Sequence, residues 1–175
     1  QLMRQGRNSE AQAGFETALK LDPGHELARR TLVGLLLEKK RVADAERELQ
    51  EGLQVNPQQT SFAMLLARLL VEQNEVAQAL DTLQKALPYA DKQADYQAFV
   101  AALLQRQNKH ADAIAYYQKA LQLKPQSGVW LMGLGISLRA EQRNTEARET
   151  FQHALDSNSL NAELQAFVRQ QIKEL

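Results

Sequence analysis

Cysteine is absent from this chain, which excludes disulfide bonds, thiol catalysis and zinc–thiolate sites. Neither charge sign is in excess, because Lys plus Arg and Asp plus Glu number 21 each. Without a positive field to attract phosphates, nucleic acid is not expected as a partner. No apolar run approaches the roughly 18 residues that a membrane-spanning helix needs. We therefore expect this part of the protein not to be embedded in a membrane.

Residue clusters that could carry chemistry are also scarce. His25, His110 and His153 have no common spacing, and none has another ligand-type residue beside it on an inward face, so we interpret them as solvated histidines. No pair of a general acid and a general base is indicated. The Gly-Leu-Gly motif at 133–135 lies inside an expected helix rather than after a strand, which favours close helix packing over dinucleotide binding. We expect no enzyme activity, no metal and no cofactor.

The sequence matches itself at an offset of 34 residues. Alanine marks this period five times, a large apolar or aromatic residue follows four positions later, and a tiny residue follows three positions after that. Side chains at i, i+4 and i+7 lie on one face of a helix. The three columns are Ala11, Ala45, Ala79, Ala113 and Ala147; Phe15, Leu49, Leu83, Tyr117 and Phe151; and Ala18, Gly52, Ala86, Ala120 and Ala154.

A further helical face occupies the other half of each period. Polar turns at 5–8, 73–74 and 107–108 separate the two helices, and the prolines at 23, 57 and 125 end each pair. Each period is therefore predicted to be a helix-turn-helix hairpin that shares a core with its neighbours. The columns of this face are Leu32, Leu66, Val100 and Leu134; Val33, Ala67, Ala101 and Gly135; and Leu36, Leu70, Leu104 and Leu138.

This pattern resembles the tetratricopeptide repeat, in which a small residue, an aromatic residue, alanine and proline recur with this period. Trp130, followed by Leu134 and Gly135, gives the fullest match. The resemblance implies an all-α fold, an α-solenoid of helix-turn-helix hairpins wound into a right-handed superhelix. We place a single array over 1–175, and we expect the natural protein to extend upstream. Its parts are a partial repeat at 1–25, full repeats at 26–59, 60–93, 94–127 and 128–161, and a capping helix at 162–175.

The resemblance also implies a non-catalytic scaffold that binds a protein or peptide partner. In this family the concave surface is made mainly by the first helix of each hairpin, and peptides lie along it. Here those positions are apolar, with arginines at the margin, although such a stripe of methionine and aromatic residues also fits a packed core. The predicted groove residues are Arg30, Met64, Leu65, Arg68, Phe99, Ala102, Met132 and Ile136, with Thr31, Ala98, Val129 and Gly133 beside them.

Three stretches, at 127–138, 147–151 and 160–164, carry a second resemblance. They look like the C-terminal part of bacterial proteins needed for biogenesis of mannose-sensitive haemagglutinin (MSHA) pili, a type IV pilus system. That resemblance implies a protein with a membrane-anchored N-terminal part, a repeat domain in the periplasm, and partners in the pilus-assembly machinery. A cytoplasmic location is the alternative.

A different kind of function stays open beside peptide capture. The incomplete first repeat and the capping helix both present surfaces that another copy of the chain could cover. Such a homotypic assembly module would use its terminal helices, and changes near Leu2 or Ile172 would then alter self-association. Peptide capture in the groove would instead be lost on Phe99→Glu.

Overall fold

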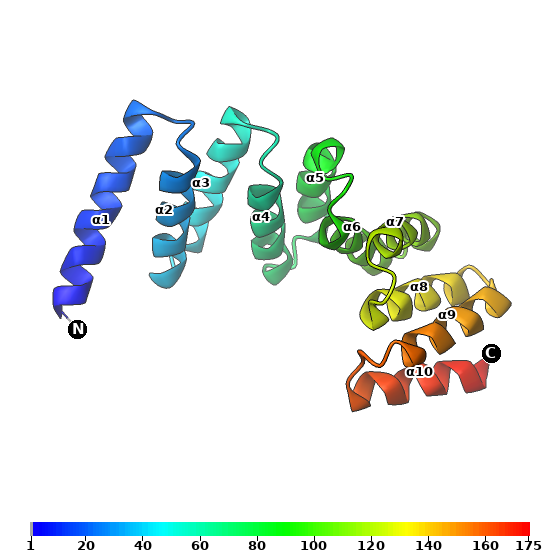
Figure 1. The fold of residues 1–175 in the computed structure, drawn as a ribbon. Coiled ribbons are helices and arrows are strands. Elements are labelled where there is room, and N and C mark those ends of the chain that lie inside the picture. The colour runs from blue at the N-terminus through cyan, green and yellow to red at the C-terminus, as the bar shows by residue number, and fades with distance from the viewer. Residues whose placement is uncertain (1) are drawn as a thin grey trace. The chain divides into compact units, whose positions relative to one another are not determined.

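The computed structural model describes residues 2–175, with side-chain surroundings from Gly6 onward. Over this range the chain forms ten α-helices and one short 3-10 helix, with no strand (Figure 1). It divides into two compact units, the first ending at Tyr89 and the second spanning Ala90–Leu175. The all-α fold class predicted from the sequence is confirmed.

Each unit is a stack in which every helix packs against its neighbours along the chain. The first unit holds α1 (Leu2–Leu21), α2 (Glu26–Glu38), α3 (Val42–Val55), α4 (Thr60–Glu72), α5 (Val76–Ala86) and the 3-10 helix η1 (Leu87–Tyr89). The second holds α6 (Ala94–Arg106), α7 (His110–Leu123), α8 (Gly128–Ala140), α9 (Asn144–Asp156) and α10 (Ala162–Glu174). Helices α2, α4, α6 and α8 are the first helices of hairpins, and α3, α5, α7 and α9 are the second helices.

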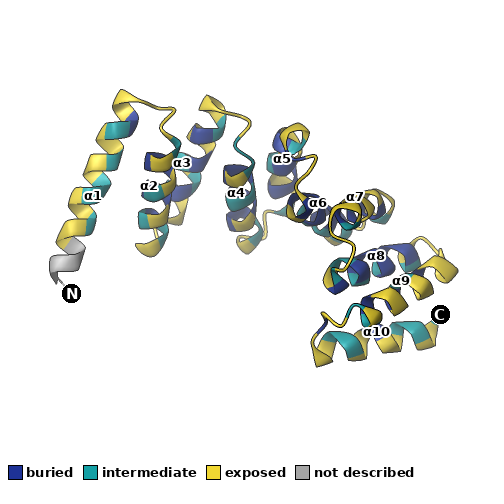
Figure 2. Ribbon diagram, viewed as in Figure 1, coloured by how far each residue is buried: buried dark blue, intermediate teal, exposed yellow. Residues whose placement is uncertain are grey.

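The predicted small and large columns form the core of both units (Figure 2). In α3, α5, α7 and α9 the column alanines are fully buried. The large residues four positions later are buried as well, with an exposed fraction of at most 5%. The second face is equally buried in the first helices. Only in α1, which has one neighbouring helix, are the matching residues Ala11, Phe15 and Ala18 half-exposed.

Two glycines of α8 bring pairs of helices into close contact in the core. A Cβ atom on Gly133 of α8 would lie 2.5 Å from Cζ of Tyr117 in α7, and one on Gly135 would lie 2.6 Å from Cε1 of Phe151 in α9. Carbon atoms do not approach this closely without displacement. The interpretation of the 133–135 motif as close helix packing is therefore confirmed.

The turn inside each complete hairpin uses a residue with positive φ. This residue is Lys40, Asn74, Asn108 or Gln142, with φ between 57° and 65°. The next residue donates its N–H to the carbonyl of the residue five positions before it, as in Arg143 N to Leu138 O at 2.9 Å, which is the Schellman end of a helix. The polar turns predicted at 73–74 and 107–108 are confirmed.

The turn predicted at 5–8 is wrong, because α1 runs through it without a break. Gly6 stands 34 residues before Lys40, so it occupies the turn position of a complete hairpin. The structure has a continuous helix at this position, and its regular backbone hydrogen bonds take the place of the turn.

The unit boundary falls within the predicted repeat 60–93. Helix α5 has 11 residues, whereas α3 and α7 have 14 each. Pro88 explains the early end, because a proline ring cannot continue an α-helix and lacks an N–H group. The chain turns through η1 there, and Asp91 stands where other repeats have proline.

We expect Ala113→Leu to lower the free energy of unfolding by about 1–3 kcal/mol, since a larger side chain would overpack the fully buried contact between helices. Thermal and urea unfolding measure the change. Ala115→Leu, at an exposed position of the same helix α7, is the control and should be neutral. Equal stability of both variants would refute the register of the repeat.

We expect Gln142→Gly to raise the free energy of unfolding by about 0.5–1 kcal/mol, because glycine adopts positive φ without the steric cost that other residues bear. Urea unfolding tests this value. Asn108→Gly should give a smaller rise, since asparagine tolerates the same conformation better than glutamine does. A loss of stability in Gln142→Gly would contradict the assigned turn geometry.

Candidate protein-binding faces

In the first unit, the predicted groove residues lie on α2 and α4 and remain partly accessible. Met64 and Leu65 are half-buried, and Arg30 and Arg68 are exposed. Arg30 is not a free cation, because its Nη2 lies 2.6 Å from Oε1 of Glu26 and 3.4 Å from Oγ of Ser61 on α4. Arg68 makes no ion pair with any residue that the structure describes, so its charge is available to a partner.

In the second unit, the predicted residues lie on α6 and α8. They are all half-buried, with Phe99 and Ala102 on α6 and Met132 and Ile136 on α8. Two residues placed beside them in the prediction face inward instead. Ala98 is buried in the core, and the position of Gly133 next to Tyr117 leaves no room for a side chain.

The sequence analysis missed Phe167 of α10. This residue stands 34 positions after Gly133 and 68 after Phe99, so it occupies the same position of the next first-type helix. Its side chain is 40% exposed. The sequence analysis predicted α10 only as a capping helix, although the repeat period alone was sufficient to find Phe167.

Local contacts fix the position of α10. Asn161 caps its N-terminus, with Oδ1 accepting from the Leu164 N–H at 2.9 Å. Near the C-terminus of α10, Arg139 of α8 donates to Oε1 of Gln171 at 2.6 Å and pairs with Glu174 at 2.8 Å. Val168 is fully buried beneath the helix. Phe167 is therefore held outward by a helix that is anchored at both ends.

A polar network ties α6, α7 and α8 together. The Gln105 amide donates from Nε2 to the Gly133 carbonyl and to Ser137 Oγ, both at 2.8 Å, and its Oε1 accepts from Tyr117 Oη at 3.4 Å. Burial raises the pKa of Tyr117 to about 12, so the phenol stays a neutral donor at physiological pH. His110 Nδ1 lies 3.1 Å from Ser137 Oγ and completes the network.

The interpretation of all three histidines as solvated is wrong for His110, which is half-buried in this network. His25 and His153 are exposed, although His25 also accepts the Ala28 N–H at the start of α2, at 3.1 Å. The Ser137 and His110 pair resembles a nucleophile beside a base, but Ser137 is fully buried and bonded to Gln105. The contact therefore connects α7 to α8 within the fold.

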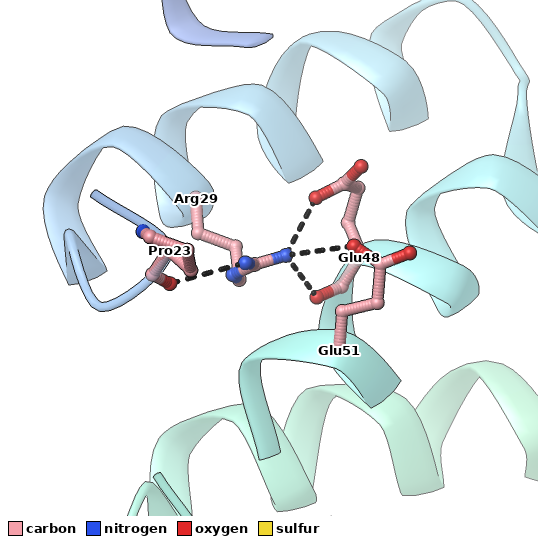
Figure 3. Close-up of polar contacts among 4 residues, drawn as sticks. All are labelled: Pro23, Arg29, Glu48 and Glu51. Atoms are coloured by element: carbon pink, nitrogen blue, oxygen red, sulfur yellow. Dashed lines mark hydrogen bonds and ion pairs between the residues drawn. The ribbon is translucent and has the colours of Figure 1, made fainter. Parts of the chain in front are cut away.

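A second polar cluster lies between α2 and α3 (Figure 3). Arg29 is 3% exposed, and its Nη1 lies 2.7 Å from Glu48 Oε2, 3.1 Å from the Glu48 carbonyl and 3.5 Å from Glu51 Oε2. Its Nη2 donates to the Pro23 carbonyl at 3.2 Å. Burial raises the pKa of Glu48, while the Arg29 charge opposes that shift. Both terminal nitrogens of Arg29 are therefore bonded within the fold.

Neither a metal site nor a membrane span is found in the part of the chain that the structure describes. Among residues 2–175 no three His, Cys, Asp or Glu side chains gather closely enough to hold a metal ion. None of the helices in this range combines the length and apolar character that crossing a bilayer requires.

Stacked helix pairs with a 34-residue period and buried alanine columns agree with the tetratricopeptide repeat. Two tetratricopeptide repeat family models match the chain, one at residues 2–69 and 49–103 and the other at residues 101–162. The chain belongs to the tetratricopeptide repeat family. Proteins of this family are in general interaction scaffolds rather than enzymes.

Solved structures of other tetratricopeptide repeat proteins share this fold. One crystal structure of MamA has 20% identity, covers 89% of this chain and 91% of its own, and gives a TM-score of 0.73. YrrB is described as a TPR protein with an unusual peptide-binding site. Its structure has 17% identity, the match covers 99% of this chain and 87% of YrrB, and the TM-score is 0.75. MamA from Desulfovibrio magneticus RS-1 has 16% identity, the match covers 89% of this chain and 88% of that MamA chain, and the TM-score is 0.69.

At these identities the similarity shows the fold alone. No curated protein sequence matches this chain. The family and the fold together indicate protein partners for this chain.

We expect Gln105→Ala to lower the free energy of unfolding by about 1–3 kcal/mol, because the Gly133 carbonyl and Ser137 hydroxyl would lose a buried donor. Urea unfolding of the purified chain provides the measurement. Gln118→Ala, at an exposed site on α7, serves as the control and should leave stability unchanged. The network would have no stabilising role if the two variants unfolded alike.

Proposed function

We propose that the first-helix faces bind a peptide segment of a partner protein, and that the face of the second unit supplies the main apolar contact. One observation carries this proposal: Phe99 and Phe167 occupy the same repeat position and both remain partly exposed, whereas the apolar residues of the repeat columns in this unit are buried. Partly exposed aromatic side chains on a rigid surface are typical anchors of protein interfaces.

Met132 and Ile136 of α8 extend this apolar surface. Methionine is flexible and polarisable, so it adapts to partner side chains of different shape. The network of Gln105 holds α6 and α8 at a fixed spacing, which reduces the entropy lost on binding. YrrB, which shares the fold, is described as having a peptide-binding site, and this supports a peptide ligand here.

The first unit offers a different surface. Met64 and Leu65 supply a smaller apolar area, and Arg68 adds a positive charge that no described residue neutralises. A carboxylate of the bound segment would pair with Arg68 there. Arg30 contributes less, since Glu26 already neutralises it.

We propose further that this scaffold acts in the biogenesis of an MSHA-type type IV pilus, as the periplasmic domain of an inner-membrane protein. The resemblance of residues 127–138 to such proteins supports this assignment. Those residues include most of α8, so they coincide with the surface that carries Met132 and Ile136. The partner would then be a segment of the pilus-assembly machinery.

The purified chain should capture pilus-assembly proteins from a lysate of its own organism, identified by mass spectrometry. Phe99→Glu and Phe167→Glu should each abolish capture, because a carboxylate would be desolvated on binding. Ala115→Glu, at an exposed position of α7, should leave capture unchanged. Circular dichroism checks that each variant is folded.

Capture that survives both phenylalanine substitutions would reject the first-helix face of the second unit as the binding surface. If the wild-type chain, but neither phenylalanine variant, captured proteins unrelated to pilus assembly, the proposed binding surface would be supported and the pilus assignment rejected. These two results are therefore distinguishable in one experiment.

Self-association through the terminal helices is the second candidate, and one observation favours it. A surface pocket of about 530 Å³ lies between α9 and α10, with Leu155 and Ile172 among its lining residues. Recovery of the chain bound only to itself, with loss on Ile172→Glu, would support homotypic assembly. The side chain of Leu2, the other position predicted to respond, lies outside the described residues.

A further inference from the structure

A pocket in the first unit is lined by none of the predicted groove residues. It has a volume of about 830 Å³ and is formed by the second helices α3 and α5, with α4 between them. Pockets of this size commonly accommodate a ligand or a short peptide. Its lining residues are Gln50, Leu53, Gln54, Pro57, Leu66, Leu70, Ala77, Gln78, Asp81, Thr82, Lys85 and Ala86.

The floor and the rim of this α3–α5 pocket differ in chemistry. Leu66 and Leu70 of α4 and Leu53 of α3 form an apolar floor. The rim carries one acidic and one basic residue, Asp81 and Lys85, whose Oδ2 and Nζ lie 2.8 Å apart. These two charges neutralise each other, so the lining favours an occupant with uncharged side chains.

The equivalent groove one repeat earlier provides an internal comparison. It lies between α1 and α3, has a smaller pocket of about 420 Å³, and is lined by charged residues. Arg29 fills its base with the ion pairs to Glu48 and Glu51 (Figure 3). In the repeat that forms the α3–α5 pocket, the position of Arg29 is taken by Ala63, and Glu48 and Glu51 are replaced by Thr82 and Lys85. These replacements leave the α3–α5 pocket unfilled and without net charge.

Amide side chains stand on both sides of the pocket. Gln50 and Gln54 project from α3, and neither amide bonds to any residue that the structure describes. Gln78 projects from α5 and makes one long hydrogen bond, from Nε2 to Glu75 Oε2 at 3.3 Å. Each glutamine amide offers two donors and one acceptor. Such groups can hydrogen-bond the N–H and carbonyl groups of an extended peptide backbone.

We propose that the α3–α5 pocket binds a short extended segment of a partner protein that carries uncharged apolar side chains. Its side chains contact the leucine floor, and its backbone is hydrogen-bonded by the glutamines of the rim. A helical segment would satisfy its own backbone groups and gain nothing from these amides. This site is separate from the first-helix faces, so it does not depend on the function proposed for them.

Random peptides of about twelve residues, displayed on phage and selected on the intact chain, provide the probe. The enriched sequences are synthesised with a fluorophore, and their affinity is measured by fluorescence anisotropy. We expect uncharged sequences with alternating apolar residues, whose affinity changes by less than about twofold when salt is raised about tenfold.

Ala77→Trp tests the location, because Ala77 is exposed and its larger replacement would fill the pocket. We expect it to weaken binding at least about tenfold, which corresponds to loss of most of the apolar contact. Ala111→Trp is the matched control, since Ala111 is the exposed second residue of α7, as Ala77 is of α5. That control should leave peptide binding unchanged.

The backbone contacts have their own test. The double variant Gln50→Ala and Gln54→Ala should weaken binding several-fold, and so should methylation of the peptide amides. Binding that withstands Ala77→Trp, or that is lost equally with Ala111→Trp, would overturn the proposed site. Peptides that become helical on binding, measured by circular dichroism, or a selection that enriches no peptide, would overturn the proposed occupant.

Discussion

The fold depends on how closely neighbouring helices approach one another. At Gly133 and Gly135 the helix backbone itself contacts the rings of Tyr117 and Phe151, and the buried alanines of the second helices allow similar spacing elsewhere. A small residue on one helix and a large residue on the next fill the same space, so the core has little room for change. Every other feature of the two units, including which residues face outward, follows from that packing.

Polar groups complete what packing begins. Each complete hairpin ends its first helix with a positive-φ residue, which reverses the chain in few residues and satisfies the last carbonyl groups. The Gln105 amide then joins α6 to α8, and Arg139 joins α8 to α10. Since these bonds connect successive first-type helices, they keep Phe99 and Phe167 at fixed places within one unit.

The two sides of the hairpins have different chemistry. The first helices present half-buried apolar residues such as Met64, Phe99 and Met132, which are suited to contact with a partner. Grooves between second helices vary with the residues at a few repeat positions. Where Arg29 is present the groove is filled by ion pairs, and where Ala63 replaces it a pocket without net charge remains open. A repeat scaffold can thus change one groove without disturbing its core.

The sequence alone determined the period, the hairpins and the core columns, because buried positions admit only small or apolar side chains at regular spacing. It did not reveal the helical run of α1 through Gly6, the network of His110 and Ser137, or the pocket beside Ala77. A turn needs a neighbouring helix to pack on, a hydrogen bond needs two atoms brought within reach, and a pocket needs walls from separate helices. Those features arise from distances between residues far apart in the chain, so only the tertiary structure decided them.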